Sequence, residues 1–481
     1  MEIDDLTPAE QRVWRAFATG AEVDFRDGSD DWGPERTVRA PVLRRLLLNG
    51  PQEQGEIAAL KVRGARITGA LDLRYATVDS VVHLTHCRFE EAPDLIGAHL
   101  RYVSMRDSEM PGLQVTRARI DGSLRLTRCR FRGPVRADGA QIAGALFLEE
   151  AEATAAGTDR PALHLHQIGV DDDLCARGLR ARGLIRLDGA TVAGSLDLED
   201  AELSNPGANV LEADALEVGA NLLGRRLCAQ GRIDLRGARI PGRVDLLHAR
   251  LSNPGGAALR VSSCVIGELW LRRGPRVEGM LNLRRAEINQ LSLEPEMLPD
   301  QVRLLDLTYV FLTPHAPAED RLPMLERDGV QGFDPHAYEQ LTAAYRRTGD
   351  DQAARIVQLA KQRRRRSTLP WPGRLWGHLQ DAAVGYGFRP LRAAVWLLSL
   401  LAVGSVAYSG HRPPPLKADE APDFDPVFYT LDLLLPVISF GQESAFAPRG
   451  GYQTLSYVLV VAGWILATTV AAGVTRTISR Q

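Results

Sequence analysis

The feature that most constrains the fold of this chain is a long internal repeat. GLIRLDGATVAGSLDLEDAELSNPG (residues 183–207) aligns without a gap with GRIDLRGARIPGRVDLLHARLSNPG (residues 231–255). Within each copy, apolar and polar residues alternate, and a small residue interrupts the alternation every five or six residues. Helices need apolar residues three or four apart, whereas strands need them two apart. The repeat therefore predicts short strands that turn at each small residue.

Further copies of the motif A-x-I-x-G-x-L-x-L-x-x-A-x-I/L indicate a solenoid that spans residues 56–312. They occupy residues 64–78, 118–131, 139–152 and 276–288. The offset between the two aligned copies corresponds to two coils of roughly 24 residues each, within the usual range of solenoid repeats. We expect a mainly β fold of about ten coils, each of which is unstable alone because it buries few apolar side chains.

The A-x-L/I-x-x cadence of these copies resembles that of the pentapeptide-like repeat proteins of bacteria. That resemblance implies a right-handed β-helix. Both aligned copies close with Leu-Ser-Asn-Pro-Gly, and Pro followed by Gly suits the two central positions of a type II turn. We expect these turns to stack along one edge of the solenoid.

Helical patterns flank the repeat on both sides. Thr7-Pro-Ala-Glu10 is a capping box with Pro at the first helical position, and it predicts a helix that ends at Gly20. Residues 1–55 are expected to form a helical cap over the apolar end of the solenoid. Residues 313–388 are expected to form a helical hairpin followed by a basic juxtamembrane segment.

The C-terminal part of the chain carries two apolar segments, residues 391–408 and 455–474, each long enough to cross a bilayer. Residues 389–481 are therefore expected to form a domain with two transmembrane α-helices. The loop between the segments is poor in Arg and Lys, so the positive-inside rule predicts a multi-pass protein of the cell membrane with both termini cytoplasmic. A basic run before the first segment is expected to face membrane lipid; it contains Lys361, Arg363, Arg364, Arg365 and Arg366.

Between the two apolar segments, the sequence predicts a short apolar helix that begins at Asp425, ends at Pro436 and is followed by a segment that ends in an aromatic residue and Gly. This arrangement of residues 425–441 resembles the pore loop of two-helix potassium-type channels. The resemblance implies a re-entrant loop whose backbone carbonyls coordinate an ion; the filter residues would be Val437, Ile438, Ser439, Phe440 and Gly441. Asp432 lies inside the apolar helix and needs a partner. The alternative is an interfacial helix that lies on the membrane surface without conducting.

Two departures from the channel family argue against potassium selectivity. Ser439 stands where the family has its first filter glycine, and Pro436 stands at the filter threonine. A pore would also require an oligomer, because non-helical backbone at membrane depth must be covered by protein or by a water-filled cavity.

Composition and motifs argue against several other functions. The net charge is −2, which provides no overall attraction to nucleic acid. The sequence contains no dinucleotide-binding, phosphate-binding, zinc-protease or nucleophile-elbow motif, so we expect no cofactor, no metal and no catalytic residues. The five cysteines include no CxxC pair, and we expect them to be small reduced residues of the core.

Three functions remain open. The first is a non-enzymatic, membrane-anchored scaffold or sensor whose cytoplasmic solenoid binds a protein partner. The second is an oligomeric pore-loop channel, a tetramer, that the solenoid gates. The third is an enzyme with a site on the solenoid surface. The sequence favours the first of these because the repeat builds a regular surface and no catalytic motif accompanies it.

Overall fold

The computed structural model describes the following residues: 5–26, 32–155, 161–327, 333–367, 370–371, 390–417, 421–435 and 438–478. For residues 390–394 and 468–478 only the backbone is described. The chain forms two compact units, Met1–Gln340 and Leu341–Gln481, which are considered separately below. The boundaries of the four expected domains stay a prediction.

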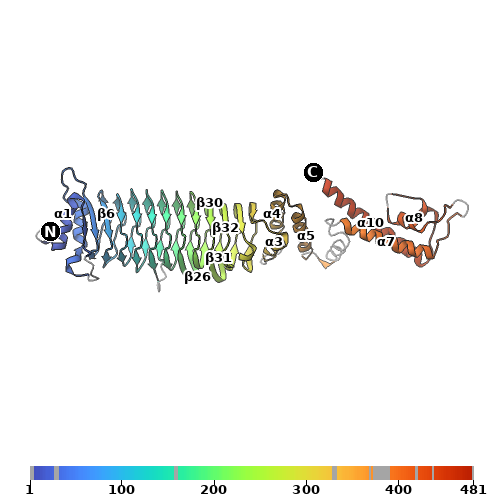
Figure 1. Ribbon diagram of the computed structural model, residues 1–481, viewed down its shortest axis with the longest axis horizontal. Coiled ribbons are helices and arrows are strands. Elements are labelled where there is room, and N and C mark those ends of the chain that lie inside the picture. Colours follow the sequence, from blue (N-terminus) through green and yellow to red (C-terminus); the bar gives the residue numbers. More distant parts are fainter. Residues whose placement is uncertain are drawn as a thin grey trace. The chain divides into compact units, whose positions relative to one another are not determined.

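The first unit is a right-handed β-solenoid of about 11 turns, visible as stacked strands between α1 and α3 in Figure 1. Each regular coil contributes two short strands to each of two parallel sheets. In one coil, β12 (Arg119–Ile120) and β13 (Leu124–Arg125) belong to one sheet, and β14 (Arg130–Phe131) and β15 (Val135–Arg136) belong to the other. The predicted β-solenoid is thereby confirmed.

Within the described residues, the first sheet has 20 strands and the second has 16. The other strands of the first sheet are β1 (Glu22–Asp24), β3 (Ala59–Arg63), β5 (Thr77–Val78), β6 (Val81–Thr85), β8 (His99–Leu100), β9 (Val103–Ser104), β16 (Gln141–Ile142), β17 (Leu146–Phe147), β20 (Gly169–Val170), β21 (Leu174–Cys175), β24 (Thr191–Val192), β25 (Leu196–Asp197), β27 (Glu217–Val218), β28 (Leu222–Leu223), β30 (Arg239–Asp245), β32 (Val265–Leu271), β34 (Glu287–Leu293) and β36 (Thr308–Thr313). The other strands of the second sheet are β2 (Thr37–Arg39), β4 (Arg66–Thr68), β7 (Arg88–Phe89), β10 (Glu109–Met110), β11 (Leu113–Gln114), β18 (Glu152–Thr154), β19 (Leu163–His164), β22 (Arg180–Arg182), β23 (Ile185–Arg186), β26 (Glu202–Glu212), β29 (Cys228–Asp234), β31 (Arg250–Arg260), β33 (Glu278–Asn282) and β35 (Gln301–Arg303).

Strand register explains why the aligned copies of the repeat lie two coils apart. Ala181 pairs with Leu203, and Leu203 pairs with Ala229, so the second of these two coils is the longer. The longer coil contains the Ser-Asn-Pro-Gly loop within β26, where Gly207 has a φ of +79°, as a type II turn requires. The repeat therefore consists of one coil with the loop and one without it. The expected counterpart of this loop around residues 156–160 lies outside the described residues.

Each coil turns at residues in the left-handed backbone region, and many of these residues are not glycine. One column of such turns contains Gly178, Asp200, Arg226 and His248, with φ values of +65°, +58°, +56° and +60°. For a residue with a Cβ, this conformation costs roughly 1–2 kcal/mol, which the hydrogen bonds and packing of the stacked coils must offset. The turns therefore present polar side chains, including those of Asp200 and Arg226, in a regular column.

The core consists of apolar side chains that stack on their equivalents in neighbouring coils. Phe131, 2% exposed, lies between Met110 and Ala153, its register partners in the two adjacent coils. Three of the cysteines, Cys87, Cys129 and Cys264, are also buried, and burial raises the pKa of each thiol to about 12. These three are core residues, as the sequence predicted.

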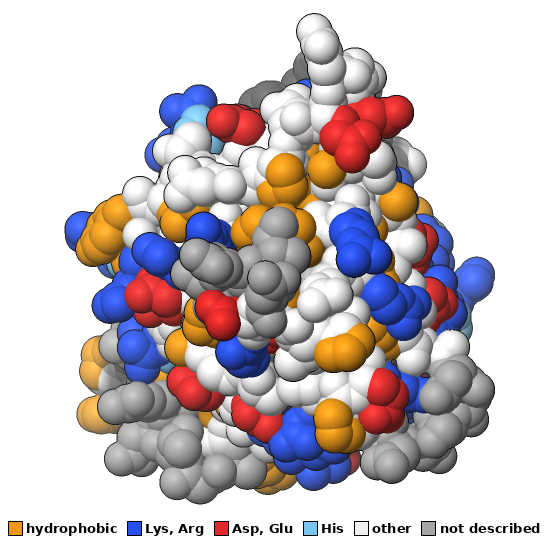
Figure 2. Space-filling view, turned by 90° about the vertical axis from the view of Figure 1, so that its left-hand side faces the viewer, with side chains coloured by type: hydrophobic (Ala, Val, Ile, Leu, Met, Phe, Trp, Pro, Cys, Tyr) orange, Lys and Arg blue, Asp and Glu red, His pale blue; other side chains and the backbone are white. Residues whose placement is uncertain are grey.

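The N-terminal end of the solenoid is covered by α1 (Pro8–Thr19) and α2 (Ala40–Asn49), with the short 3-10 helix η2 (Pro34–Arg36) between them. The capping box forms: the Glu10 backbone N–H donates to Thr7 Oγ1, and the Thr7 backbone N–H donates to the Glu10 carboxylate. Glu10 is fully buried and also accepts hydrogen bonds from the Arg39 guanidinium and backbone N–H. Viewed from this end, charged side chains of both signs are interspersed with hydrophobic ones (Figure 2).

At the other end of the solenoid, η3 (Pro295–Met297) lies between β34 and β35, and α3 (Ala318–Glu326) follows β36. The buried Arg321 guanidinium of α3 donates to the carbonyl oxygens of Leu293 and Pro314, at 2.5 and 2.6 Å. These two bonds tie the helix to the last coils and satisfy carbonyls that would otherwise end the hydrogen-bond ladder.

The remaining helices are α4 (Pro335–Arg347) and α5 (Asp351–Ser367), then α7 (Pro390–Gly410), α8 (Pro426–Leu434), α9 (Gln442–Ala445) and α10 (Gly451–Ile478). Gln358 of α5 donates to the hydroxyl of Thr342 on α4, both buried. In the second unit, α7, α8 and α10 pack around a small aromatic and leucine core that includes Tyr408, Tyr429 and Phe446. The Tyr408 hydroxyl donates to the carbonyl oxygen of Tyr452.

The helices α7 and α10 coincide with the two expected membrane spans. Among the residues that the structure describes, however, no helix is both long and apolar enough to cross a membrane. The predicted fold with two transmembrane α-helices and the predicted multi-pass location in the cell membrane are therefore wrong.

Replacing the buried ring at the centre of the solenoid should destabilise it strongly. Phe131→Ala is expected to lower the free energy of unfolding by about 3–5 kcal/mol, because stacked coils on both sides prevent the cavity from collapsing. The loss of β circular dichroism on heating measures this effect. The control Arg119→Ala, at a side chain that is 74% exposed, should leave the midpoint nearly unchanged; an equal effect of both variants would contradict the assigned core.

The Glu10–Arg39 pair should make the stability of the cap depend on pH. Burial alone would raise the pKa of Glu10, but hydrogen bonds from Arg39 and from the Thr7 and Arg39 backbone lower it overall from 4.5. The stabilisation is therefore complete above about pH 4.5 and is lost as the pH falls through the lowered pKa.

Glu10→Gln should accordingly lower the free energy of unfolding by about 1–3 kcal/mol at pH 7, and this difference should shrink as the pH falls below 4. Thermal melts of the variant and the parent across pH 3–7 measure the difference. Glu53→Gln, at an exposed carboxylate, is the matched control. A difference for Glu10→Gln that persists unchanged at pH 3 would show that the ion pair is not its source.

Candidate functional site

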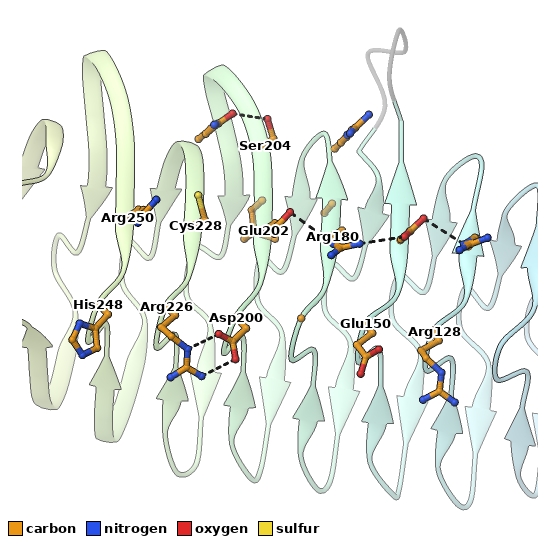
Figure 3. Close-up of a pocket in the computed structure, with 17 residues that line it drawn as sticks. Arg128, Glu150, Arg180, Asp200, Glu202, Ser204, Arg226, Cys228, His248 and Arg250 are labelled. Carbon is orange, nitrogen blue, oxygen red and sulfur yellow. Dashed lines mark hydrogen bonds and ion pairs between the residues drawn. The ribbon is translucent and has the colours of Figure 1, made fainter. Parts of the chain in front are cut away.

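A groove of 1330 Å³ runs along one side of the solenoid and is lined by 17 residues (Figure 3). Its residues come from the second sheet and from the turns that precede the strands of that sheet. Two parallel rows of side chains line it. The strand row contains Arg130, Glu152, Arg180, Glu202, Cys228 and Arg250, and the turn row contains Arg128, Glu150, Gly178, Asp200, Arg226 and His248.

The strand row is a stack in direct register across successive coils. Arg130 pairs with Glu152, Glu152 with Arg180, and Arg180 with Glu202. Charges directly opposite each other on adjacent strands, about 4.8 Å apart, attract when they differ in sign and repel when they are alike. Alternation of sign is therefore the arrangement that lets four consecutive coils carry charge at one position.

The ion pairs within the strand row are loose. The distances between guanidinium nitrogens and carboxylate oxygens are 3.6 Å for Arg130–Glu152 and 3.7 Å for both Arg180–Glu152 and Arg180–Glu202. These values exceed hydrogen-bond length, and the four side chains are 43–71% exposed. Pairs of this kind contribute about 0–1 kcal/mol, so their hydrogen-bonding capacity remains largely unused.

The turn row is held much more tightly. Arg226 donates to both carboxylate oxygens of Asp200, at 2.5 and 2.7 Å, and also to Glu199 at 3.2 Å. The hydrogen bonds from Arg226 lower the pKa of Asp200. Arg128 makes an equivalent pair with Asp107, one coil earlier, at 2.6 and 3.1 Å. These bidentate pairs fix the side chains of Arg128, Asp200 and Arg226 in place.

The first sheet provides a contrast, because its corresponding surface position does not alternate. Successive coils there carry His99, Arg119, Gln141, Gly169, Thr191, Glu217 and Arg239. A solenoid of this type therefore does not need alternating charge at each coil in order to fold. The regular alternation is a property of the groove side.

Cys228 and His248 lie at the C-terminal end of the groove. Cys228 occupies a strand-row position between Glu202 and Arg250, and His248 belongs to the turn row of the next coil (Figure 3). His248 Nδ1 is 2.6 Å from the carbonyl oxygen of Arg273, so this nitrogen donates and Nε2 remains free to accept. Within the described residues, no three His, Cys, Asp or Glu side chains are grouped as a metal ion would require.

The residues expected to form an ion filter lie between α8 and α9, with Val437 outside the described residues. Ile438 and Phe440 are 54% and 46% exposed, and Gly441 has a φ of +83°. The other filter residue, Ser439, accepts a hydrogen bond from the Gly441 backbone N–H. No observation supports a pore loop, and the filter assignment stays a prediction.

The expected partner of Asp432 proves to be backbone. Asp432 is 4% exposed, and its carboxylate accepts hydrogen bonds from the N–H groups of Phe440, Gln442 and Glu443, at 2.5, 2.7 and 3.1 Å. These are donors in the first turn of α9 and just before it, where a carboxylate satisfies unpaired N–H groups. Asp432 therefore holds the loop between α8 and α9 in place.

The basic run lies in the C-terminal half of α5, with Arg364, Arg365 and Arg366 in the last turn. Positive charge at this end complements the helix dipole. Contact of Lys361, Arg363 and their neighbours with lipid stays a prediction.

The second unit exposes large apolar side chains on two helices. On α7 they are Val395, Trp396, Leu398, Val403 and Val406, and on α10 they are Tyr457, Val458, Val461, Trp464 and Ile465, all between 38% and 72% exposed. Such a concentration is typical of a surface that another molecule covers. These residues belong to the apolar segments that we expected to be membrane spans.

The sequence did not reveal the groove, because unequal coil lengths hide its rows. Glu202 follows Arg180 by one short coil, whereas Cys228 follows Glu202 by one long coil that contains a Ser-Asn-Pro-Gly loop. A reading at a fixed interval therefore leaves the row after two or three coils. If these loops are removed from the sequence, the residues of one row recur at an interval of one short coil. That interval identifies the row.

The fold and the groove define a right-handed β-solenoid repeat protein whose second sheet presents alternating charge. Comparison of the chain with protein families, with curated proteins and with solved structures gives no match. The function is therefore argued from the solenoid and its groove alone.

Cys228 should be the fastest-reacting thiol of the native chain when the groove is unoccupied. It is partly exposed in the groove, whereas burial raises the pKa of the Cys175 thiol to about 11 and those of the three core thiols to about 12. Reaction with Ellman's reagent at pH 8 should show a fast phase that Cys228→Ser removes and Cys175→Ser retains. Survival of the fast phase in Cys228→Ser would mean that another cysteine is more accessible.

Proposed function

We propose that this protein is a non-enzymatic scaffold that binds a protein partner in the groove between the strand row and the turn row. The observation that carries the proposal is the strand row, in which exposed charges of alternating sign have largely unused hydrogen-bonding capacity. Interfaces use such charges to select a partner and to fix its orientation.

The rigidity of the solenoid supports this role. Parallel hydrogen bonds on both sides hold each groove strand, and the bidentate Arg226–Asp200 and Arg128–Asp107 pairs fix one wall of the groove. A surface that is already ordered before binding loses little conformational entropy when the partner docks. The contact positions are therefore preorganised.

The size and chemistry of the groove also fit a macromolecule. Its lining of 17 residues approaches the roughly 20–30 residues per side of a standard protein interface. Six of these residues are Arg, a residue enriched in protein interfaces because its planar guanidinium binds carboxylates through two hydrogen bonds. The channel and enzyme alternatives gain no comparable support from the described residues.

A photo-cross-linker placed in the groove should capture another protein chain in living cells. Gln230 is an exposed residue of the groove, and Gln141 is an exposed residue of the same type on the first sheet. We expect p-benzoylphenylalanine at position 230 to give defined protein adducts, identified by mass spectrometry, and the same group at position 141 to give few.

The adducts should also depend on the charges of the strand row. Arg130→Ala combined with Arg180→Ala should reduce the yield at position 230 several-fold, because both guanidinium groups contact the bound partner in this proposal. Equal yields at positions 230 and 141, or no adduct at either, would refute a partner-binding groove.

A further inference from the structure

We infer that the groove binds a second copy of this chain, docked antiparallel about a two-fold axis that passes between the coils of Glu152 and Arg180. The inference rests on the proposed function and names its partner. It is drawn from the order of charges in the two rows.

The strand row is self-complementary under this symmetry. A two-fold axis that lies in the interface and crosses the solenoid at a right angle reverses the order of the coils but keeps each row opposite its own equivalent. Reversal of the four charges Arg130, Glu152, Arg180 and Glu202 places a negative charge opposite each positive one. Arg130 then faces Glu202 of the second copy, and Glu152 faces Arg180 of the second copy.

The turn row obeys the same symmetry, although its charges follow a different order. Around the same axis, Arg128 faces Asp200 of the second copy and Glu150 faces Gly178. One coil further out, Asp107 faces Arg226. Both rows are therefore complementary around the same axis.

The complementary segment has a defined length. In the strand row, Glu109 faces Cys228 of the second copy, and the next coil outward would place Arg88 opposite Arg250, two like charges. The match therefore extends over six coils, from the coil of Asp107 and Glu109 to the coil of Arg226 and Cys228. At about 4.8 Å per coil this segment is roughly 24 Å long.

The charges also select the register. A shift of the second copy by one coil in one direction places Arg130 opposite Arg180, and a shift in the other direction places Glu152 opposite Glu202. Either shift brings like charges together in the strand row, which costs binding free energy. Antiparallel docking about the stated axis avoids these repulsions.

A shift of two coils in one direction also keeps opposite charges together in the strand row. In the turn row, however, that shift replaces the Arg128–Asp200 and Arg226–Asp107 contacts with Arg128–Glu150 alone, so the turn row favours the stated axis.

The spacing of the charges favours a second solenoid over an extended peptide. Side chains on one face of an extended strand are about 6.6–6.8 Å apart, whereas the coils repeat at about 4.8 Å. A peptide lying along the groove would lose register with the strand row after a few residues. A second copy has the same coil spacing and keeps its charges opposite their counterparts throughout.

The register can be tested with a disulfide. Glu109 and Cys228 of one chain are five coil spacings apart, about 24 Å, so cysteines at these positions cannot bond within one solenoid. Across the proposed axis the two positions face each other. We expect the full-length Glu109→Cys chain to form a covalent dimer under mild oxidation, seen on a non-reducing gel, and the additional change Cys228→Ser to abolish it.

Charge exchange tests the symmetry with the same readout. In the Glu109→Cys background, Glu152→Arg or Arg180→Glu alone should lower the dimer yield more than tenfold, since each places like charges opposite one another twice per dimer. A mixture of the two single variants should restore cross-linking between them. The double exchange should also restore it, although within each chain it places Arg130 beside a new Arg and Glu202 beside a new Glu.

Glu217→Arg, on the first sheet, is the matched control and should leave the yield unchanged. A double exchange that cross-links as poorly as the single variants, or mixed single variants that do not cross-link, would overturn the inference. If Gln230 captures another protein while no Glu109→Cys disulfide forms, the second copy is excluded and the scaffold proposal stands. If neither cross-link forms, both fail.

Discussion

The in-register parallel pairing of successive coils is the interaction on which the rest of this structure depends. Many of its strands are only two residues long, and each pairs with the same position in the coils before and after it. Each position of the coil is therefore repeated every ~4.8 Å along the solenoid, and the side chains at that position form a row in which each contacts its neighbours. Rows of Leu, Ile, Val and Ala form the core. Rows of charged residues must solve the problem of repulsion between neighbours.

The rows of this solenoid avoid repulsion between like charges in different ways. The differences separate arrangements that folding requires from one that suits binding. The first sheet dilutes charge with residues such as Gln141 and Thr191. The turn row forms short bidentate pairs such as Arg226–Asp200, which leave little unused capacity. The strand row keeps its charges exposed and pairs them loosely, at 3.6–3.7 Å. Stability alone does not demand this third solution, and that is why we propose that the strand row binds a partner.

Much of the fold was predictable because it follows from local patterns. The alternation around Ile233 and Leu235 indicated strands, the offset between the aligned copies indicated two coils, and Thr7 with Glu10 indicated the first helix. The left-handed turns at Arg226 and His248 were not predictable, because neighbouring coils rather than local propensity hold them there. For the same reason the turn row, and with it one wall of the groove, is invisible in the sequence.

The C-terminal segments show the limit of hydropathy as a guide. Their apolar residues were read as spans, yet part of that character is used within the unit, where Tyr408 and Leu459 pack against Tyr429 of α8. Asp432, which looked like a costly polar residue of a pore, satisfies backbone donors at the start of α9. A sequence shows that such a carboxylate needs a partner. It does not show which backbone N–H groups will provide that partner, because every residue except proline carries one.

The groove and the exposed apolar side chains of α7 and α10 would contribute differently to any assembly. Apolar contacts such as those available to Trp396 and Trp464 are strong but non-directional, because their free energy follows the area removed from water. They do not fix which residue lies opposite which. The charged rows contribute less free energy per contact and are weakened by salt, yet a shift of one coil turns attraction into repulsion. In this protein, specificity would therefore come from the groove, and the apolar helices could add affinity without changing the register that the groove selects.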